Sequence, residues 1–153
     1  MSDKIEFQFD SPNDSPGYLL GQVTMLWQRK QKRVLDPLDL THTQFVLLAS
    51  LAWLSKTSHS VTQVDIARQS NADRMMVSKV LRTLENKGFI TRHEHETDTR
   101  AKIIRLTTKG QNVLQAALTS VEDADHEFFS ALGTDLSAFN TNMVQLINEN
   151  KTD

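Results

Sequence analysis

The chain has 153 residues, of which 39% are hydrophobic and 24% are charged, and it contains no cysteine. This length fits one globular domain that buries about two-thirds of the surface of its unfolded chain. Without cysteine, the chain can form neither disulfide bonds nor a thiol redox switch. The longest mainly apolar run, residues 45–54, is too short to cross a bilayer, and the acidic, polar start does not resemble a signal peptide. We therefore expect a cytoplasmic protein that makes no membrane contact.

Charge is unevenly distributed along the chain, although the net charge is only −2. Residues 68–109 contain ten Lys or Arg and five Asp or Glu, a local charge of +5, which leaves −7 on the remainder. Salt screens charges that lie more than about 10 Å apart, so a phosphate backbone would respond to this local charge. We expect the basic region to face DNA and the acidic remainder to face away from it.

The first 16 residues lack helical periodicity, and Pro12 and Pro16 indicate an arm rather than a folded domain. Within this arm Ile5, Phe7 and Phe9 alternate with polar residues. Two interpretations are open: a flexible tail, or an extended arm that packs against a partner subunit.

Two helices are predicted after the arm. The first, residues 18–35, is amphipathic and ends at Asp36, which precedes a proline. Favourable interaction with the helix dipole is the preferred explanation for the cations in its last turns, and contact with DNA is the alternative. Thr41 and Gln44 form a capping box that begins the second helix, in which residues 45–54 are apolar on nearly every side. Such a helix must lie at the centre of the molecule.

Two short helices joined by a tight connection follow. Thr62 can cap the first, which runs through Gln69, and either Asn71 or Asp73 can cap the second. In each case a side-chain oxygen accepts hydrogen bonds from backbone amides that lack a partner inside the helix. Gly88 ends the second helix, because glycine adopts the left-handed conformation without a Cβ clash.

The second of these short helices has one apolar face and one basic face. Its apolar stripe recurs at helical spacing and consists of Val77, Val80, Leu81 and Leu84. The opposite face carries Met75, Lys79, Arg82 and Asn86, with Arg74 and Ser78 on its flank. An ordinary solvated surface is the alternative explanation for this basic face.

A β-hairpin is predicted next. Residues 89–93 and 101–107 are rich in β-branched and apolar residues, and they flank the polar run EHETDT. The returning side carries Arg100, Lys102 and Arg105, which places cations beside the basic helix face. Two helices joined by a tight turn and followed by a basic hairpin describe a winged helix-turn-helix, which inserts its second helix into the major groove of DNA.

Two further helices are predicted to complete the chain. Thr107 or Thr108 can cap a long helix with an apolar side and an acidic middle, and Gly133 breaks it before the last helix. Pairing with the first helix and with a second copy of the chain would bury the apolar stripes of these helices, giving a two-fold dimer. The two basic helices would then lie about one DNA turn apart, roughly 34 Å, on a pseudo-palindromic site.

The run DRMMVSKVLRTLENKGFITR, followed by DTRAKIIRLTTKG, resembles the MarR family of bacterial winged-helix transcription regulators. The second string matches the family's wing signature, D-x-R-x-K and then L-T-x-x-G. THTQFVLLASLAWL and VTQVDIARQS resemble the family's second and third helices. The resemblance implies a mainly α (α+β) fold in which residues 40–109 form the winged helix-turn-helix and residues 1–38 and 110–153 form the dimerisation region of a single domain. It also implies a homodimeric protein that binds double-stranded DNA, usually a repressor that a small-molecule effector releases.

Residues from both short helices and the hairpin are expected to contact DNA. They are Gln63, Arg74, Met75, Ser78, Lys79, Arg82, Asp98, Arg100 and Lys102. Arg100 resembles the family's wing arginine, which enters the minor groove, and Asp98 can orient it through a charge-assisted hydrogen bond. Met75 and Met76 depart from the family, which commonly has small polar residues there. Met75 can touch thymine methyl groups, whereas Met76 can belong to the core.

An effector pocket between the DNA-binding unit and the helical dimer region is a further implication of the resemblance. Trp27, Trp53, His42 and Met25 are candidates for lining it, and each is better explained as a core residue. The alternative function is a winged-helix module that binds an acidic protein partner through the same basic face.

Metal binding and catalysis have little support in the sequence. His93 and His95 share one face of a predicted strand, and Glu122 and His126 lie one helical turn apart. Neither pair has a third ligand nearby in the sequence, so solvated polar side chains are the better explanation. The chain lacks a glycine-rich phosphate loop, a G-x-S-x-G elbow and an H-E-x-x-H pair. We expect no cofactor and no enzymatic activity.

Overall fold

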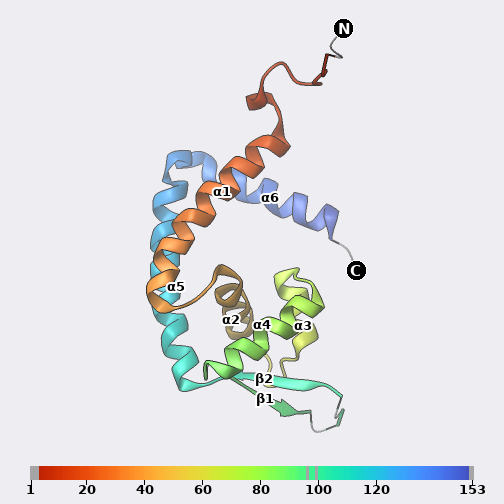
Figure 1. Ribbon diagram of the computed structural model, residues 1–153, viewed down its shortest axis with the longest axis vertical. Coiled ribbons are helices and arrows are strands. Elements are labelled where there is room, and N and C mark those ends of the chain that lie inside the picture. The colour runs from red at the N-terminus through yellow and green to blue at the C-terminus, as the bar shows by residue number, and fades with distance from the viewer. Residues whose placement is uncertain (1–3, 96, 99, 152–153) are drawn as a thin grey trace.

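The computed structural model describes residues 4–95, 97–98 and 100–151, and it is mainly helical (Figure 1). Its α-helices are α1 (Pro16–Leu35), α2 (His42–Leu54), α3 (Gln63–Ser70), α4 (Arg74–Asn86), α5 (Thr108–Phe129) and α6 (Leu136–Asn150). Its strands are β1 (Ile90–Glu94) and β2 (Lys102–Leu106), and its short 3-10 helices are η1 (Pro12–Asp14), η2 (Asp36–Leu38) and η3 (Ser130–Asp135). Two positions of the predicted hairpin turn, Glu96 and Thr99, lie outside the described residues.

The helix starts follow the capping side chains of the sequence. Ser15 accepts a hydrogen bond from the backbone amide of Tyr18 at 3.3 Å, so α1 begins two residues earlier than predicted. The capping box of α2 is confirmed, because Thr41 Oγ1 accepts from the amide of Gln44 and Gln44 Oε1 accepts from the amide of Thr41, each at 3.1 Å. These bonds satisfy amides that have no partner within the helix.

The hydrophobic core is formed around α2, as its all-round apolar sequence predicts. Leu47, Leu48 and Leu51 of this helix are buried and pack with α3, α4 and the first half of α5. Helix α1 joins the core near its C-terminal end, where Leu35 is buried. One lobe therefore contains α2, α3, α4 and the hairpin, and the long α5 leads away from it (Figure 1).

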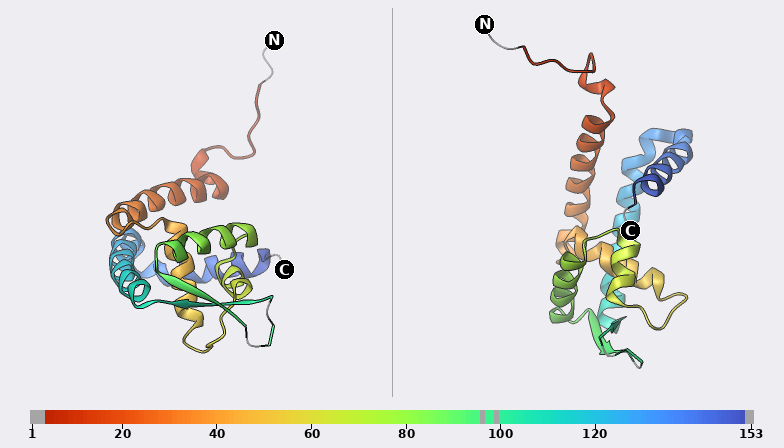
Figure 2. Two further views of the ribbon diagram at one scale, coloured as in Figure 1. Left: turned by 60° about the horizontal axis from the view of Figure 1, so that its bottom comes forward. Right: turned by 90° about the vertical axis from the view of Figure 1, so that its right-hand side faces the viewer.

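Helices α1, α5 and α6 form the other end of the molecule. Helix α1 lies along α5, and the chain turns back after α5 so that α6 passes over α3 (Figures 1 and 2). Helix α5 ends at Phe129, earlier than the predicted break, and Gly133, with φ of 53°, lies in the 3-10 turn that follows. No residue of α6, all of which are described, is buried.

The N-terminal arm points away from the rest of the chain (Figure 2). Residues 4–10 form neither helix nor strand, and the side chains of Ile5, Phe7 and Phe9 are exposed. Within the described ranges, no helix combines the length and apolarity that a membrane span requires.

Candidate nucleic-acid interface

The α3–α4 unit is held by caps at both sides of its turn. Asn71 ends α3 in the left-handed conformation, with φ of 52°, and Asp73 caps α4. Asp73 Oδ1 accepts hydrogen bonds from the amides of Met75 at 2.9 Å and Met76 at 3.1 Å. Of the two caps predicted as alternatives for α4, Asp73 is therefore the one used, and Asn71 serves the preceding helix instead.

Helix α4 divides into the two predicted faces. Val77, Leu81 and Leu84 are buried against the core, and Val80 is half-buried. The exposed face carries Arg74, Met75, Lys79, Arg82 and Asn86, while Ser78 and Met76 are half-buried. The side chain of Met75 is 83% exposed, so an apolar group stands in the middle of a basic surface. This surface therefore suits a partner that carries both negative charges and apolar groups.

The hairpin is joined to a third segment, Val61 and Thr62, which the sequence pattern did not predict as its partner. Strands β1 and β2 pair antiparallel, with Ile90 opposite Leu106 and Glu94 opposite Lys102. On the other side of β2, the amide of Ile104 donates to the carbonyl of Val61 at 2.8 Å. An isolated bridge links Thr62 to Ile103. The start of α3 is thus hydrogen-bonded to the wing, which fixes one relative to the other.

Polar contacts also fix the wing to the end of α4. Arg92 of β1 donates to Glu85 of α4 at 3.1 Å. Thr107 Oγ1 donates to the carbonyl of Gly88 at 2.6 Å and accepts from the amide of Gly110 at 3.0 Å, which caps α5. The cap predicted at Thr107 or Thr108 is therefore Thr107.

The predicted contact between Asp98 and Arg100 at the wing tip is confirmed. Asp98 Oδ1 accepts from Nε of Arg100 at 3.3 Å and from its backbone amide at 3.1 Å, and the Arg100 side chain is 92% exposed. His95 Nδ1 accepts from the amides of Thr97 and Asp98 within the turn. The terminal guanidinium nitrogens of Arg100 extend into solvent, where they can bind a phosphate or a base edge.

One prediction about the histidines is wrong. Strand β1 ends at Glu94, so His95 lies in the turn and does not share a strand face with His93. His93 instead contacts the hydroxyl of Thr91 at 2.9 Å. In the ranges the structure covers, no group of three or more His, Asp or Glu side chains could hold a metal ion.

The residues expected to contact DNA lie on α3, α4 and the wing. Those on α4 share its exposed side, and Arg100 is exposed at the wing tip. Gln63 is half-buried at the first position of α3, and Lys102 lies 3.7 Å from Glu94 across the hairpin. Arg105 donates to the carbonyl of His59 at 3.3 Å and is therefore held near the segment before α3.

The candidates for an effector pocket have different environments. Trp27 Nε1 and Gln31 Nε2 both donate to Asp125 Oδ1 at 2.8 Å, which connects α1 to α5. The ring of His42 contacts the ring of Trp27 edge-on, and 4.9 Å separates the two ring centres. Burial lowers the pKa of His42, and the charge of Asp125 partly opposes this shift.

The core explanation is wrong for the other two candidates, Trp53 and Met25. Their side chains are 60% and 51% exposed. Trp53 lies at the end of α2, where the ammonium of Lys56 is 4.3 Å from the centre of its ring.

Comparison with known proteins yields matches over most of the chain. A family model described as ArnR1-like, winged-helix domain matches residues 36–125. A Bacillus subtilis (strain 168) protein named as an uncharacterized HTH-type transcriptional regulator, YdcH, is 47% identical over 124 residues, covering 81% of this chain and 84% of that protein.

Two solved structures with bound DNA are similar to this fold. The S. aureus MepR–DNA complex matches with a TM-score of 0.78 and 26% identity, covering 88% of this chain and 98% of that one. A mutant of E. coli MarR complexed with operator DNA matches with a TM-score of 0.75 and 25% identity, covering 86% of this chain and 91% of that one.

Proposed function

This chain belongs to the MarR family of winged helix-turn-helix transcription regulators, and we propose that it is a homodimeric repressor that binds pseudo-palindromic DNA until a small molecule releases it. The observation that carries the proposal is the exposed basic face of α4, held in a fixed position relative to a wing with an exposed arginine at its tip.

The chemistry of α4 fits the major groove. Arg74, Lys79 and Arg82 can bind phosphates or the acceptor edge of guanine, and Ser78 can bond to either. Met75 cannot hydrogen-bond a base in this way, and its exposed thioether instead fits the methyl group of thymine. We also assign Gln63, at the start of α3, to this interface, where it would contact the DNA backbone or a base.

The wing supplies contacts to the adjacent minor groove. Arg100 extends from the tip and can enter a narrow A·T-rich groove, where the electrostatic potential is more negative. Asp98 restrains the Nε side of its guanidinium, which reduces the freedom lost on binding. Lys102, further back on β2, adds a phosphate contact.

Dimerisation would cover apolar surface that a single chain leaves exposed. On α1 the exposed apolar side chains include Leu20 and Leu26, and on α6 they include Val144, Leu146 and Ile147. Large apolar side chains exposed on two helices in this way favour an interface with a second chain. We infer that residues 1–38 and 110–153 form the dimerisation region and residues 40–109 the DNA-binding unit. A two-fold dimer then offers two α4 helices to one inverted repeat.

Release by a small molecule requires that the molecule bind one state of the dimer better than the other. An effector that stabilises a dimer whose α4 helices do not match the half-site spacing lowers DNA affinity by the ratio of its affinities for the two states. We place the repressor in the cytoplasm, where its DNA would be found.

Selection of bound duplexes from random DNA tests the proposal. We expect an inverted repeat with half-sites one helical turn apart, and an affinity for the selected duplex that falls steeply with salt because phosphate binding releases counterions. No enrichment at low salt, or an affinity that does not depend on salt, would favour the alternative of a module that binds an acidic protein.

A further inference from the structure

Met75 has the most exposed thioether among the methionines that the structure describes. Its side chain is 83% exposed, compared with 51% for Met25, and Met76 and Met143 are half-buried. Asp73 accepts a hydrogen bond from the backbone amide of Met75 at 2.9 Å, so the backbone is held at the start of α4 while the side chain projects into solvent. Because the chain has no cysteine, thioethers are its only sulfur groups, and that of Met75 is the most open of those described.

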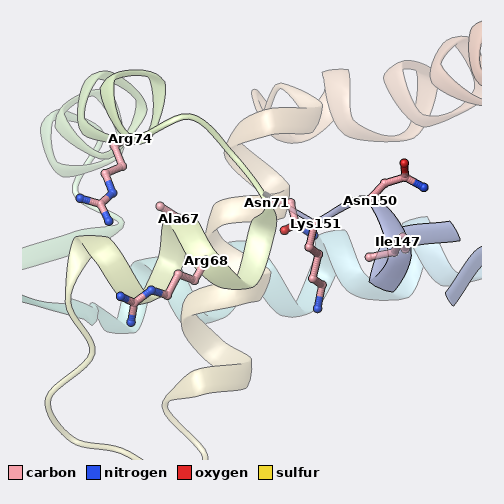
Figure 3. A pocket seen from close by; sticks show the side chains of 7 residues that line it. All are labelled: Ala67, Arg68, Asn71, Arg74, Ile147, Asn150 and Lys151. Atoms are coloured by element: carbon pink, nitrogen blue, oxygen red, sulfur yellow. The ribbon is translucent and has the colours of Figure 1, made fainter. Parts of the chain in front are cut away.

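Cations surround this thioether. Lys79 and Arg82 follow Met75 at spacings of four and seven residues along α4, which places all three on one exposed face. Arg74 is the adjacent residue, and Arg68 of α3 lines the same pocket as Arg74 (Figure 3). Over the described part of the chain, none of these four cations lies within ion-pair distance of a carboxylate. Their combined field raises the local concentration of small anions, including anionic oxidants.

We propose that Met75 is an oxidative modification site, at which hypochlorous acid converts the thioether to a sulfoxide and thereby weakens DNA binding. This oxidant suits the surface, because its conjugate base, hypochlorite, is a small anion that the cations around Met75 attract. The product can be reversed, since methionine sulfoxide reductases restore the thioether.

The reaction proceeds in two steps. The sulfur lone pair attacks the chlorine atom, an S–Cl bond forms, the O–Cl bond breaks and hydroxide leaves. Water then attacks the sulfur, an S–O bond forms, and chloride leaves with the loss of two protons, one of which neutralises the hydroxide. The net change converts one thioether and one hypochlorous acid into one sulfoxide, one chloride and one proton, so sulfur is oxidised and chlorine is reduced by two electrons.

The sulfoxide changes the chemistry that α4 presents to DNA. Its oxygen is a strong hydrogen-bond acceptor, and burying it against the methyl group of thymine would remove its hydrogen bonds to water. The same oxygen can accept from Lys79, one helical turn away, which would occupy a cation otherwise available to phosphate. This consequence rests on the proposed function, whereas the oxidation of Met75 does not.

Peptide mass spectrometry tests the modification site. The DNA-free full chain is treated with an equimolar amount of hypochlorous acid, and the sulfoxides are located after quenching. Met75 should be modified ahead of Met25, Met76 and Met143, because the reaction follows exposure and the local concentration of oxidant. Earlier modification of any of the other three would overturn the site.

Titration of a selected duplex before and after this treatment tests the effect on DNA binding. Oxidation should weaken binding by the wild type at least about fourfold, the loss expected when one buried methyl contact is removed. Subsequent treatment with methionine sulfoxide reductases should restore the affinity. Met75→Leu, which keeps an apolar side chain without sulfur, should show the same affinity before and after oxidation, whatever its starting value.

Met25→Leu is the matched control, since Met25 is the other strongly exposed methionine and lies on α1, away from α4. It should lose as much affinity on oxidation as the wild type. An equal loss in Met75→Leu, or an affinity that does not recover on reduction, would overturn the effect on DNA binding by showing damage elsewhere. Selective oxidation of Met75 with unchanged duplex affinity would also overturn that effect and leave the modification site in place. Oxidation of Met75 in a chain that binds no duplex even before treatment would instead refute the proposed function.

Discussion

Some side chains of this chain stabilise the fold, and others are exposed and available for the proposed contact with DNA. Asp73 and Thr107 are used within the chain, because their oxygens accept amides at the starts of α4 and α5. Arg100 and Met75 contribute little to the core, because their side chains are almost fully exposed. Substitutions of the second pair should therefore change DNA binding while leaving the fold intact.

Replacement of Arg100 by alanine should weaken duplex binding at least about tenfold, with little change in stability. The guanidinium would lose its contacts in the minor groove, whereas its exposed ion pair with Asp98 adds little to folding. Titration of a selected duplex at fixed salt measures the effect. Lys56→Ala, which removes an exposed cation near the end of α2, should bind like the wild type. Unchanged affinity in Arg100→Ala would remove Arg100 from the interface.

Met75 should recognise the methyl group of a thymine in the operator. Deoxyuridine at that position lacks the methyl group, and burial of one such group contributes about 0.8 kcal/mol, so the wild type should lose about fourfold in affinity. Met75→Ala should bind the thymine and deoxyuridine duplexes equally well. Scanning each operator thymine in both proteins makes the comparison, and the methyl contact is absent if the two proteins show the same losses throughout.

At the scale of elements, the junction of α4, β1 and α5 sets the direction of the wing. Gly88, with φ of 81°, ends α4, and Thr107 binds its carbonyl while capping α5. Gly110 lies so close to Phe89 that a Cβ there would overlap the carbonyl oxygen of Phe89. The glycine of the L-T-x-x-G signature thus has a physical reason, which is the close approach of α5 to the chain that follows α4.

Gly110→Ala should destabilise the protein by about 1–3 kcal/mol, because the added methyl group forces backbone to move in a packed region. Urea denaturation at one protein concentration measures the difference. Gly17→Ala is the control, since a Cβ at Gly17 meets no atom within 4 Å, and it should be neutral or slightly stabilising. Equal unfolding midpoints for the two variants would show that the junction adjusts without cost.

At the scale of the whole molecule, the arrangement of α1, α5 and α6 is the one expected of a single subunit of a dimer. Helix α6 has no buried residue of its own, and exposed apolar side chains on α1 and α6 remain to be covered. A second copy would bury them and place two DNA-binding lobes on one duplex. Dimerisation and DNA affinity should then be lost together.

Leu146→Glu should convert the dimer to monomers and weaken duplex binding by more than about tenfold, because a charge would be placed at an apolar interface. Sedimentation equilibrium and duplex titration measure the two effects. Gln145→Glu, which adds the same charge at the neighbouring exposed position of α6, should have a much smaller effect. A monomeric wild type, or a dimeric Leu146→Glu with normal affinity, would contradict the assignment of α6 to the interface.

The sequence alone determined the features that depend on neighbouring residues. The capping box of α2, the apolar stripe of α4, the stop at Gly88 and the Asp98–Arg100 contact were all predictable, because each involves side chains and backbone groups within one or two helical turns. The sequence did not determine which of Asn71 and Asp73 caps α4, since either residue type can cap a helix. The left-handed conformation of Asn71, which ends α3, leaves Asp73 as the cap.

Only the tertiary structure decided the contacts between distant segments. The hydrogen bond from Ile104 to Val61 and the hydrogen bonds from Trp27 and Gln31 to Asp125 all join residues far apart in the chain. Local periodicity reports which face of a helix is apolar, but it does not report which helix packs against that face. The packing of α1 along α5 brings Trp27 and Gln31 to Asp125, and the pairing of β2 with the segment before α3 brings Ile104 to Val61. No residue near these groups in sequence carries that information.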